Sequence, residues 1–171
     1  MNETDEDAAK AQAVHQALNS LGINYAEIKH PPVFTASQAI AAMHDIDGQG
    51  CKSLLLTTKS HDRYILVLIP DTINADTKKI AKLVDSAHLS FASPKELKQL
   101  LDLTPGSVSP FGLISDNEGK VEVVIDQLLV NKQLLFHPNT NTRTVSISYN
   151  DLLRFITEYH HNYIVGDCVK S

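Results

Sequence analysis

The sequence predicts an α+β (mixed α/β) fold formed as a single domain. Its 171 residues are enough for one hydrophobic core and need no second. Apolar residues make up 43% of the chain and charged residues 20%, a balance typical of a soluble globular protein. Helix-like and strand-like patterns are interspersed without a strict βαβ period, and no internal repeat or linker is visible. We therefore expect residues 1–171 to form one domain.

The first element is a helix over residues 5–21, where apolar side chains recur at helical spacing and Gly22 provides a stop. The predicted inner stripe consists of Ala9, Ala13, Val14, Ala17, Leu18 and Leu21. Because the outer face of this helix is acidic and would repel phosphate, we expect it to pack on the sheet and not to contact RNA. A short strand over residues 23–29 follows, and the prolines after His30 interrupt it.

The next segments alternate between helix and strand. Residues 35–43 predict a short helix capped by Thr35 or Ser37. Residues 51–57 and 63–69 are apolar, β-branched runs separated by a polar turn, which predicts a hairpin of buried strands. A helix is expected over residues 76–84, with its inner side formed by Ile80, Leu83 and Val84.

The strongest local signal is Ser93-Pro94-Lys95-Glu96, which predicts a helix over Pro94–Leu101. A serine cap, a proline at the first helical position and a glutamate three residues after the serine form a capping box. Strands are then expected over residues 120–129, 133–137 and 142–148, with Asn131-Lys132 turning between the first two. A helix over residues 150–159 closes the chain, and its inner side is formed by Leu152, Leu153, Phe155 and Ile156.

Charge and hydropathy limit the class of protein. A net charge of −5 argues against a protein that binds DNA or RNA over its whole surface, although a local contact with one RNA end stays open. Apolar runs such as residues 64–70 are far shorter than the ~20 residues of a membrane span. The N-terminus is acidic, unlike a signal peptide, so a cytoplasmic location is favoured. Cys51 and Cys168 are then expected to be reduced.

Several familiar catalytic arrangements are missing from the sequence. His160 and His161 are adjacent and no HxxxH or CxxC pair exists, so no metal site is expected. Cys51 begins an apolar strand and is interpreted as a buried hydrophobe. The Gly106-Ser107-Val108-Ser109 segment does not have the GxSxG spacing of a serine hydrolase, and no phosphate-binding loop GxxxxGK[ST] occurs.

Three segments carry candidate chemistry. Lys52 stands at the start of a buried strand beside Gly50, where it projects either into a cleft as a fixed positive charge or into solvent. Residues 105–113, PGSVSPFGL, hold two prolines and two glycines, and such a stiff backbone can present amides to an oxyanion. Residues 137–142, HPNTNT, place a histidine at a strand end before a polar turn.

Taken together, these segments resemble the YbaK and prolyl-tRNA synthetase-associated domain family. The matching blocks, in family order and approximate spacing, are GCKSLLL from Gly50, YILVLIP from Tyr64, LSFASPKEL from Leu89, PGSVSPFGLI from Pro105 and HPNTNTRTVSIS from His137. The resemblance covers about residues 30–159 and is greatest to free-standing members that deacylate mischarged Ala-tRNA(Pro). It implies one editing domain with a mixed, mostly antiparallel sheet flanked by helices.

The resemblance also implies an activity. Such proteins hydrolyse the ester between a wrongly attached small amino acid and the terminal adenosine of a tRNA, with no metal or other cofactor. The expected partner is the acceptor end of a mischarged tRNA, with prolyl-tRNA synthetase as a further candidate. Lys52 resembles the essential lysine of the family and is assigned as catalytic together with Gly106, Ser107 and Ser109. The residues assigned to substrate binding are Ser53, Phe111, Gly112, His137, Asn141, Phe34 and Met43.

An aminoacyl ester is already activated, so this chemistry needs no protein nucleophile. We expect Lys52 to hold the phosphate or ribose of the adenosine while amides near Gly106 orient the carbonyl. Two positions depart from close family members, since Ser53 stands in place of asparagine and Ser90 in place of arginine. Two alternatives therefore stay open. The protein could edit Ser- or Cys-charged tRNA, or it could bind aminoacyl-tRNA or a synthetase without turnover.

Overall fold

The structure is a computed structural model and describes residues 3–33, 35, 37–38 and 45–171. The helices within these residues are α1 (Asp5–Ser20), α3 (Thr77–Leu83), α4 (Pro94–Leu101) and α5 (Tyr149–Glu158), with 3-10 helices η2 (Pro110–Ser115) and η3 (Gln127–Leu129). The strands are β1 (Ala26–Lys29), β2 (Gln49–Thr58), β3 (Tyr64–Pro70), β4 (Leu89–Phe91), β5 (Val121–Asp126), β6 (Gln133–Phe136), β7 (Arg143–Ser148) and β8 (Tyr163–Gly166).

The strands form one mixed sheet in the order β1-β7-β6-β2-β3-β5-β8, with β4 added beside β2. Four pairings are antiparallel, namely β1 with β7, β7 with β6, and β2 with both β3 and β4. Three are parallel, namely β2 with β6, β3 with β5, and β5 with β8. The predicted α+β class and the mixed, mostly antiparallel sheet are therefore confirmed.

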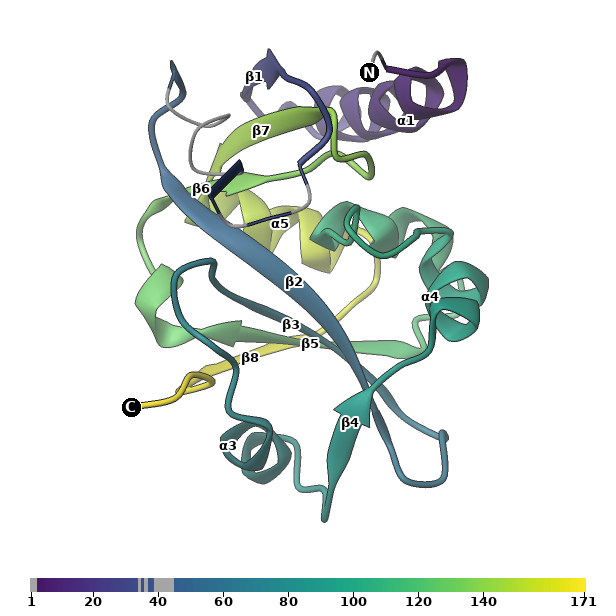
Figure 1. Cartoon of the computed structure of the whole chain (residues 1–171), viewed down its shortest axis with the longest axis vertical. Helices are drawn as coiled ribbons and strands as arrows, with labels where there is room; N and C mark the ends of the chain where they lie inside the picture. Colours follow the sequence, from purple (N-terminus) through teal and green to yellow (C-terminus); the bar gives the residue numbers. More distant parts are fainter. Residues whose placement is uncertain (1–2, 34, 36, 39–44) are drawn as a thin grey trace.

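Strand β2 joins the two halves of this sheet. One edge of β2 pairs with β3 over residues 51–57. The other edge pairs with β6 only at Gln49 and Gly50, and with β4 only from Leu56 onward. Figure 1 shows β2 as a long diagonal strand between the upper strands β1, β7 and β6 and the lower strands β3, β5 and β8. Between Gly50 and Leu56, no strand among the described residues pairs with β2 on that edge.

Apolar side chains form a cluster on each face of the sheet. The larger cluster packs α1, α4 and α5 against one face, and Phe111 and Phe155 lie within it. The smaller cluster packs α3 against the other face through Ile80 and Val84. Successive side chains of a strand point to opposite faces, so Cys51 and Leu55 of β2 join the larger cluster while Leu56 joins the smaller.

Local signals set the helix ends. The predicted capping box of α4 is present, with the Ser93 hydroxyl accepting from the Glu96 amide and the Glu96 carboxylate accepting from the Ser93 amide. Thr4 and Asp7 form a second capping box at α1. Such caps satisfy amide groups that the first turn of a helix leaves without partners. None of the described helices combines the length and apolar character needed to cross a membrane.

The structure corrects several details of the sequence analysis. In α1, Ala11 is buried and the predicted Ala9 and Ala13 are exposed. The strand predicted over residues 120–129 ends at Asp126, and η3 occupies the last three residues of that range. The chain does not end with a helix, since α5 is followed by β8. Phe34, Met43 and much of the predicted helix over residues 35–43 lie outside the described residues.

Candidate active site

The candidate site lies where β2 leaves β6. The parallel register pairs Gln49 with Leu134 and Gly50 with Leu135, and then the pairing stops. Continuing this register by two residues brings Lys52 level with His137. Both side chains then lie on the face that carries Gly50, since residues two apart in a strand share a face. The sheet thus places the predicted lysine and histidine on either side of the opening between β2 and β6.

Asp71 lies on the same face and was not identified from the sequence. It follows β3 directly, and its amide donates to the Gly50 carbonyl at 3.0 Å. Its carboxylate lies over Gly50, because a Cβ atom added to this glycine would be 2.1 Å from Oδ2 of Asp71. The hairpin register makes Asp71 and Lys52 diagonal neighbours, about 7 Å apart at Cα. Burial raises the pKa of the Asp71 carboxyl, and the nearby Lys52 and His137 offset this only in part.

Lys52 is half-buried, and its ammonium group forms no hydrogen bond or ion pair within the described part of the chain. Lysine in folded proteins commonly stays exposed unless it is paired, so a half-buried and unpaired ammonium is available to an anionic ligand. Ser53 points to the opposite face of β2. Its hydroxyl is buried and has no hydrogen-bond partner among the described groups, although buried polar groups are nearly always bonded.

The PGSVSPFGL segment is a tightly bonded loop that leads into η2. Gly106 has a φ of 92°, a conformation that side chains rarely adopt. The Ser107 hydroxyl donates to the Thr104 carbonyl at 2.9 Å, and the Ser107 amide donates to the same oxygen at 3.1 Å. The Ser109 hydroxyl accepts from the Phe111 amide at 3.1 Å and caps η2. Both serine hydroxyls therefore hold the loop in shape.

This loop contacts the HPNTNT turn, so the structure brings two of the predicted segments together. The Ser109 hydroxyl donates to Oδ1 of Asn139 at 2.8 Å, and Nδ2 of Asn139 donates to the Phe111 carbonyl at 3.3 Å. A Cβ atom on Gly106 would lie 3.8 Å from Nδ2 of Asn141. Asn139 has a φ of 61°, in the left-handed region that asparagine tolerates better than most residues. Asn139, which was not predicted, is thus the main link between loop and turn.

Three amides of the loop have no acceptor among the described residues. The N–H groups of Gly106, Val108 and Ser109 donate to no other described group, whereas those of Ser107, Phe111 and Gly112 are all bonded. Unpaired backbone donors in a rigid loop can bind an oxyanion or a carbonyl oxygen. The predicted role of this backbone is therefore compatible with the observed hydrogen bonds.

His137 connects the opening to the turn. Its Nδ1 lies 2.9 Å from the Arg143 carbonyl, so Nδ1 carries the proton and donates, and Nε2 is the free nitrogen. The ring meets His30 edge to face at 5.9 Å between centroids. Burial lowers the pKa of His137, which favours the neutral imidazole. A neutral ring of this kind can shape a pocket and accept a hydrogen bond.

Arg143 holds the base of the turn in place. Its guanidinium binds both carboxylate oxygens of Glu3 at 2.7 Å and reaches Glu27 at 3.1 Å. The Thr142 hydroxyl also donates to Glu3 at 2.7 Å. These hydrogen bonds lower the pKa of Glu3 to about 2. The N-terminal end of α1 is thereby tied to the strand that follows the turn, in agreement with the prediction that this helix packs on the sheet.

Phe111 and Gly112 occupy the core and not an open surface. Phe111 is fully buried and contacts Phe136 and Phe155 edge to face. A Cβ atom on Gly112 would lie 2.7 Å from a methyl group of Leu103 and 3.1 Å from Cβ of Leu101, so a larger residue would displace buried side chains. Their predicted contact with substrate stays untested, and the packing favours an indirect role in which these residues position the loop.

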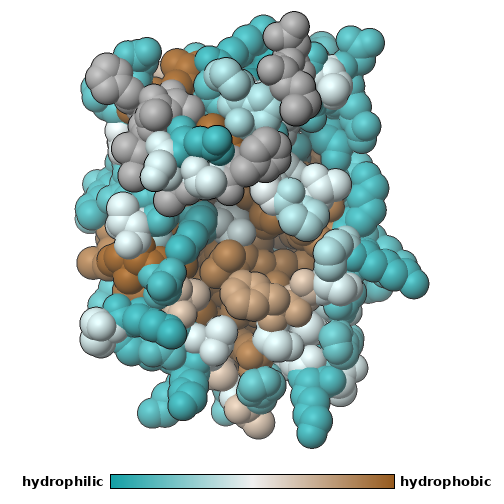
Figure 2. All heavy atoms as spheres, viewed as in Figure 1, coloured by the Kyte–Doolittle hydropathy of each residue, from teal (hydrophilic) through white to brown (hydrophobic). Residues whose placement is uncertain are grey.

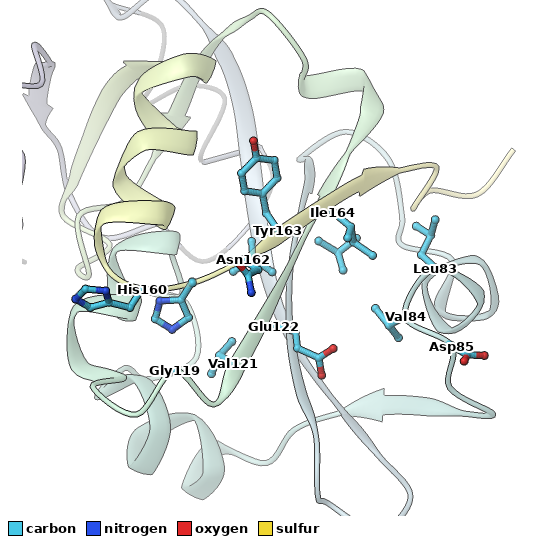
Figure 3. Close-up of a pocket in the computed structure, with 13 residues that line it drawn as sticks. Leu83, Val84, Asp85, Gly119, Val121, Glu122, His160, Asn162, Tyr163 and Ile164 are labelled. Atoms are coloured by element: carbon cyan, nitrogen blue, oxygen red, sulfur yellow. The ribbon is translucent and has the colours of Figure 1, made fainter.

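Two cavities differ in whether they contain predicted site residues. One of about 300 Å³ adjoins the loop and the turn and is lined by Lys10, Thr104, Ser107, Asn139 and Asn141 among others. Another of about 390 Å³ lies between α3 and β8 and contains none of the predicted residues. Figure 3 shows Ile164, Leu83 and Val84 along this second cavity. The first cavity contains two of the predicted site residues, Ser107 and Asn141.

Within the described residues, no group of three or more His, Cys, Asp or Glu side chains is arranged to hold a metal ion. Cys51 and Cys168 are both free and buried, and burial raises the pKa of each thiol. A thiol that is buried and protonated is a poor nucleophile. Cys51 thus behaves as the buried hydrophobe that the sequence predicts.

The face of the molecule seen in Figure 2 has an apolar centre. Figure 2 shows apolar side chains gathered in the middle of this view, with polar side chains along the margins. Phe91 of β4 contributes to the exposed apolar surface, with 63% of its area accessible. Its cross-strand neighbour on β2 is Leu56, which faces the same side of the sheet as Lys52.

Comparison with known proteins identifies the class. The family model described as "Aminoacyl-tRNA editing domain" matches residues 30–155, and the chain belongs to this family. The resemblance seen in the sequence is thereby confirmed.

Individual relatives cover nearly the whole chain. The prolyl-tRNA editing protein ProX of Acetoanaerobium sticklandii is 38% identical over 155 residues, which cover 88% of this chain and 92% of the relative. The prolyl-tRNA synthetase associated domain-containing protein 1 of Bos taurus is 29% identical, and the match covers 93% of this chain and 95% of the relative. A solved structure of a provisionally assigned trans-editing enzyme for prolyl-tRNA synthetase shares the fold, with a TM-score of 0.76 and 22% identity. The match covers 99% of this chain and 100% of that chain.

Proposed function

We propose that this protein is a trans-editing enzyme that hydrolyses the ester of mischarged tRNA(Pro), with Ala-tRNA(Pro) as the substrate, in the cytoplasm and without a metal. Its membership of the editing family and its similarity to a prolyl-tRNA editing protein support this proposal. Two observations carry most weight. The half-buried ammonium of Lys52 has no partner within the described residues, and the amides of Gly106, Val108 and Ser109 in the rigid loop have no described acceptor.

The reaction needs three things from the protein. The ester carbonyl must be held, its developing oxyanion must be stabilised, and one water must reach the carbon. The amides of Gly106, Val108 and Ser109 supply the donors in a loop that two serine hydroxyls brace. Because the donors are held before substrate binds, they lose little entropy on binding, and one such donor contributes roughly 100- to 1,000-fold in rate.

Lys52 is proposed to bind the phosphate or ribose of the terminal adenosine. Its charge is not neutralised by any described side chain, so it is available to the anionic end of the substrate. Water is proposed to be activated by a hydroxyl or phosphate of the substrate, because neither Ser107 nor Ser109 is free to act as a nucleophile. The buried and unpaired hydroxyl of Ser53 is a candidate contact for a bound ligand from the opposite face of β2.

Amino-acid choice is proposed to depend on size. A pocket that excludes larger side chains discriminates well, whereas rejecting a smaller side chain gains only about 1–3 kcal/mol per methylene. His137 and Asn141 are the proposed pocket residues that the structure describes, and Phe34 and Met43 are proposed walls outside the described residues.

The deciding experiment measures deacylation of Ala-, Ser- and Cys-tRNA(Pro) by the wild-type protein and by Lys52→Ala. We expect the fastest turnover on Ala-tRNA(Pro), a loss of about 100-fold or more in Lys52→Ala, and no change when EDTA is added. Lys59→Ala is the matched control, since Lys59 is an exposed lysine just after β2. Turnover on none of the three substrates would favour a binding module without catalysis, and a preference for Ser- or Cys-tRNA would change the substrate.

A further inference from the structure

The position of Asp71 is not accounted for by the proposed roles of the lysine and the loop. It is held by the hairpin, because its amide donates to the Gly50 carbonyl at 3.0 Å. The carboxylate occupies the space that a side chain at position 50 would fill, with Oδ2 2.1 Å from the place of that Cβ. Gly50 therefore permits a carboxylate to lie over β2 at the point where β2 stops pairing with β6.

The charges of Asp71 and Lys52 do not neutralise each other. Both side chains face the same side of the sheet and are diagonal neighbours, yet they form no ion pair with one another. Neither carboxylate oxygen of Asp71 accepts a hydrogen bond from another described residue. The carboxylate is half-buried, and burial raises its pKa by more than the nearby Lys52 and His137 lower it. The opening thus presents one unpaired cation and one unpaired anion a short distance apart.

An aminoacyl ester of tRNA carries the matching pair of charges. Its nucleotide end is anionic, and its α-ammonium group is one carbon away from the ester carbonyl. With Lys52 at the nucleotide end, the carboxylate across Gly50 is the complementary group for the ammonium. A charge-assisted hydrogen bond of this kind is stronger than a neutral one and directional.

We propose that Asp71 binds the α-ammonium group of the aminoacyl ester, and that it restricts the site to esters with a free amino group. The inference rests on the proposed function. It predicts that N-acylated and peptidyl esters are poor substrates, because an amide nitrogen carries no charge and leaves the carboxylate buried without a partner.

The test compares alanyl-tRNA(Pro) with lactyl-tRNA(Pro), in which a hydroxyl replaces the ammonium group at nearly the same size. For the wild type, we expect kcat/KM to be about 10- to 100-fold higher for the alanyl ester. Asp71→Asn keeps the shape of the side chain and removes its charge, so it should lower the alanyl rate to the lactyl rate and leave the lactyl rate unchanged. Glu118→Gln is the charge-matched control at an exposed position.

An equal fall of both rates in Asp71→Asn would overturn the inference, because it would indicate a general base for water or a damaged fold. A measurement of ligand binding distinguishes failure of this inference from failure of the proposed function. The wild type should bind 3′-alanylamino-3′-deoxyadenosine, a stable amide, about 10-fold or more tightly than its lactyl counterpart, and Asp71→Asn should not distinguish them. If the wild type binds the alanyl analogue more tightly but deacylates no substrate, only the proposed function is overturned. If the wild type binds both analogues equally, the role of Asp71 is overturned.

Discussion

Replacing Ser109 by alanine tests whether the shape of the loop matters for catalysis. The Ser109 hydroxyl is completely buried and has two partners, since it accepts from the Phe111 amide and donates to Oδ1 of Asn139. Ser109→Ala leaves the Phe111 amide buried without an acceptor. It also cuts one of the two bonds that join the loop to the turn, and the remaining bond from Asn139 to the Phe111 carbonyl is longer, at 3.3 Å.

The expected loss of stability follows from these partners. A buried donor without an acceptor costs about 1–3 kcal/mol, and the half-buried Asn139 adds less because water can reach it. For a chain of 171 residues, a loss of about 2 kcal/mol lowers Tm by roughly 4–8 °C. Ser115→Ala, which changes an exposed serine at the end of η2, is the matched control and should lower Tm by less than about 2 °C.

Activity is measured well below the Tm of the variant, so that unfolding does not contribute. A looser loop holds its free amides less firmly, and we expect the single-turnover rate on Ala-tRNA(Pro) to fall at least about 10-fold. A variant that loses stability as expected but deacylates at the wild-type rate would refute the idea that the braced loop is the catalytic device.

Three further predictions concern residues around the site. Gly50→Ala should displace the Asp71 carboxylate and reduce the rate of deacylation about 10-fold or more, and the Tm of the variant is measured as well. Cys51→Ala should keep activity within about twofold of wild type, and iodoacetamide should not label Cys51 in the folded protein. The pKa of Glu3 is lowered from 4.5 to about 2, so its bond with Arg143 stabilises the protein above pH 4.5 and is lost as the pH falls toward 2. Urea unfolding of Glu3→Gln should therefore show a lower midpoint than wild type at pH 7 and little difference near pH 2.

The elements that short-range chemistry determines could be predicted from the sequence. The capping box at Ser93 and Glu96 is a contact across three residues, and it formed as expected. The hairpin of β2 and β3 depends on two apolar runs and the turn between them, and it was also correct. Such contacts join residues that are close together in the sequence, so a single sequence carries enough information to predict them.

Other parts depend on contacts between distant segments. The parallel partners of β5 are β3 and β8, which come from opposite sides of it in the chain, and no local pattern specifies them. Strand β8 was missed because it is a short edge strand whose Tyr163, Ile164 and Val165 are exposed, and so it lacks the alternation of a half-buried strand.

For the site, the residue types were easier to predict than the positions. Lys52 and the glycines of the loop stand out in the sequence, but the link through Asn139 depends on how the loop meets the turn. Asp71 could have been found from the hairpin register, because counting back from the turn pairs Cys51 with Pro70 and brings the next residue opposite Gly50. Phe111 was assigned to the substrate, yet its ring fits between Phe136 and Phe155 in the core.

We propose that an aminoacyl-adenosine end binds where β2 and β6 separate, against the free amides of the loop. Titration of the ¹⁵N-labelled protein with 3′-alanylamino-3′-deoxyadenosine, followed by NMR, tests it directly. We predict that the largest amide shifts occur at Gly106, Val108 and Ser109 and around Lys52. Shifts concentrated instead along the groove between α3 and β8, with these four residues unchanged, would show that the adenosine end binds elsewhere.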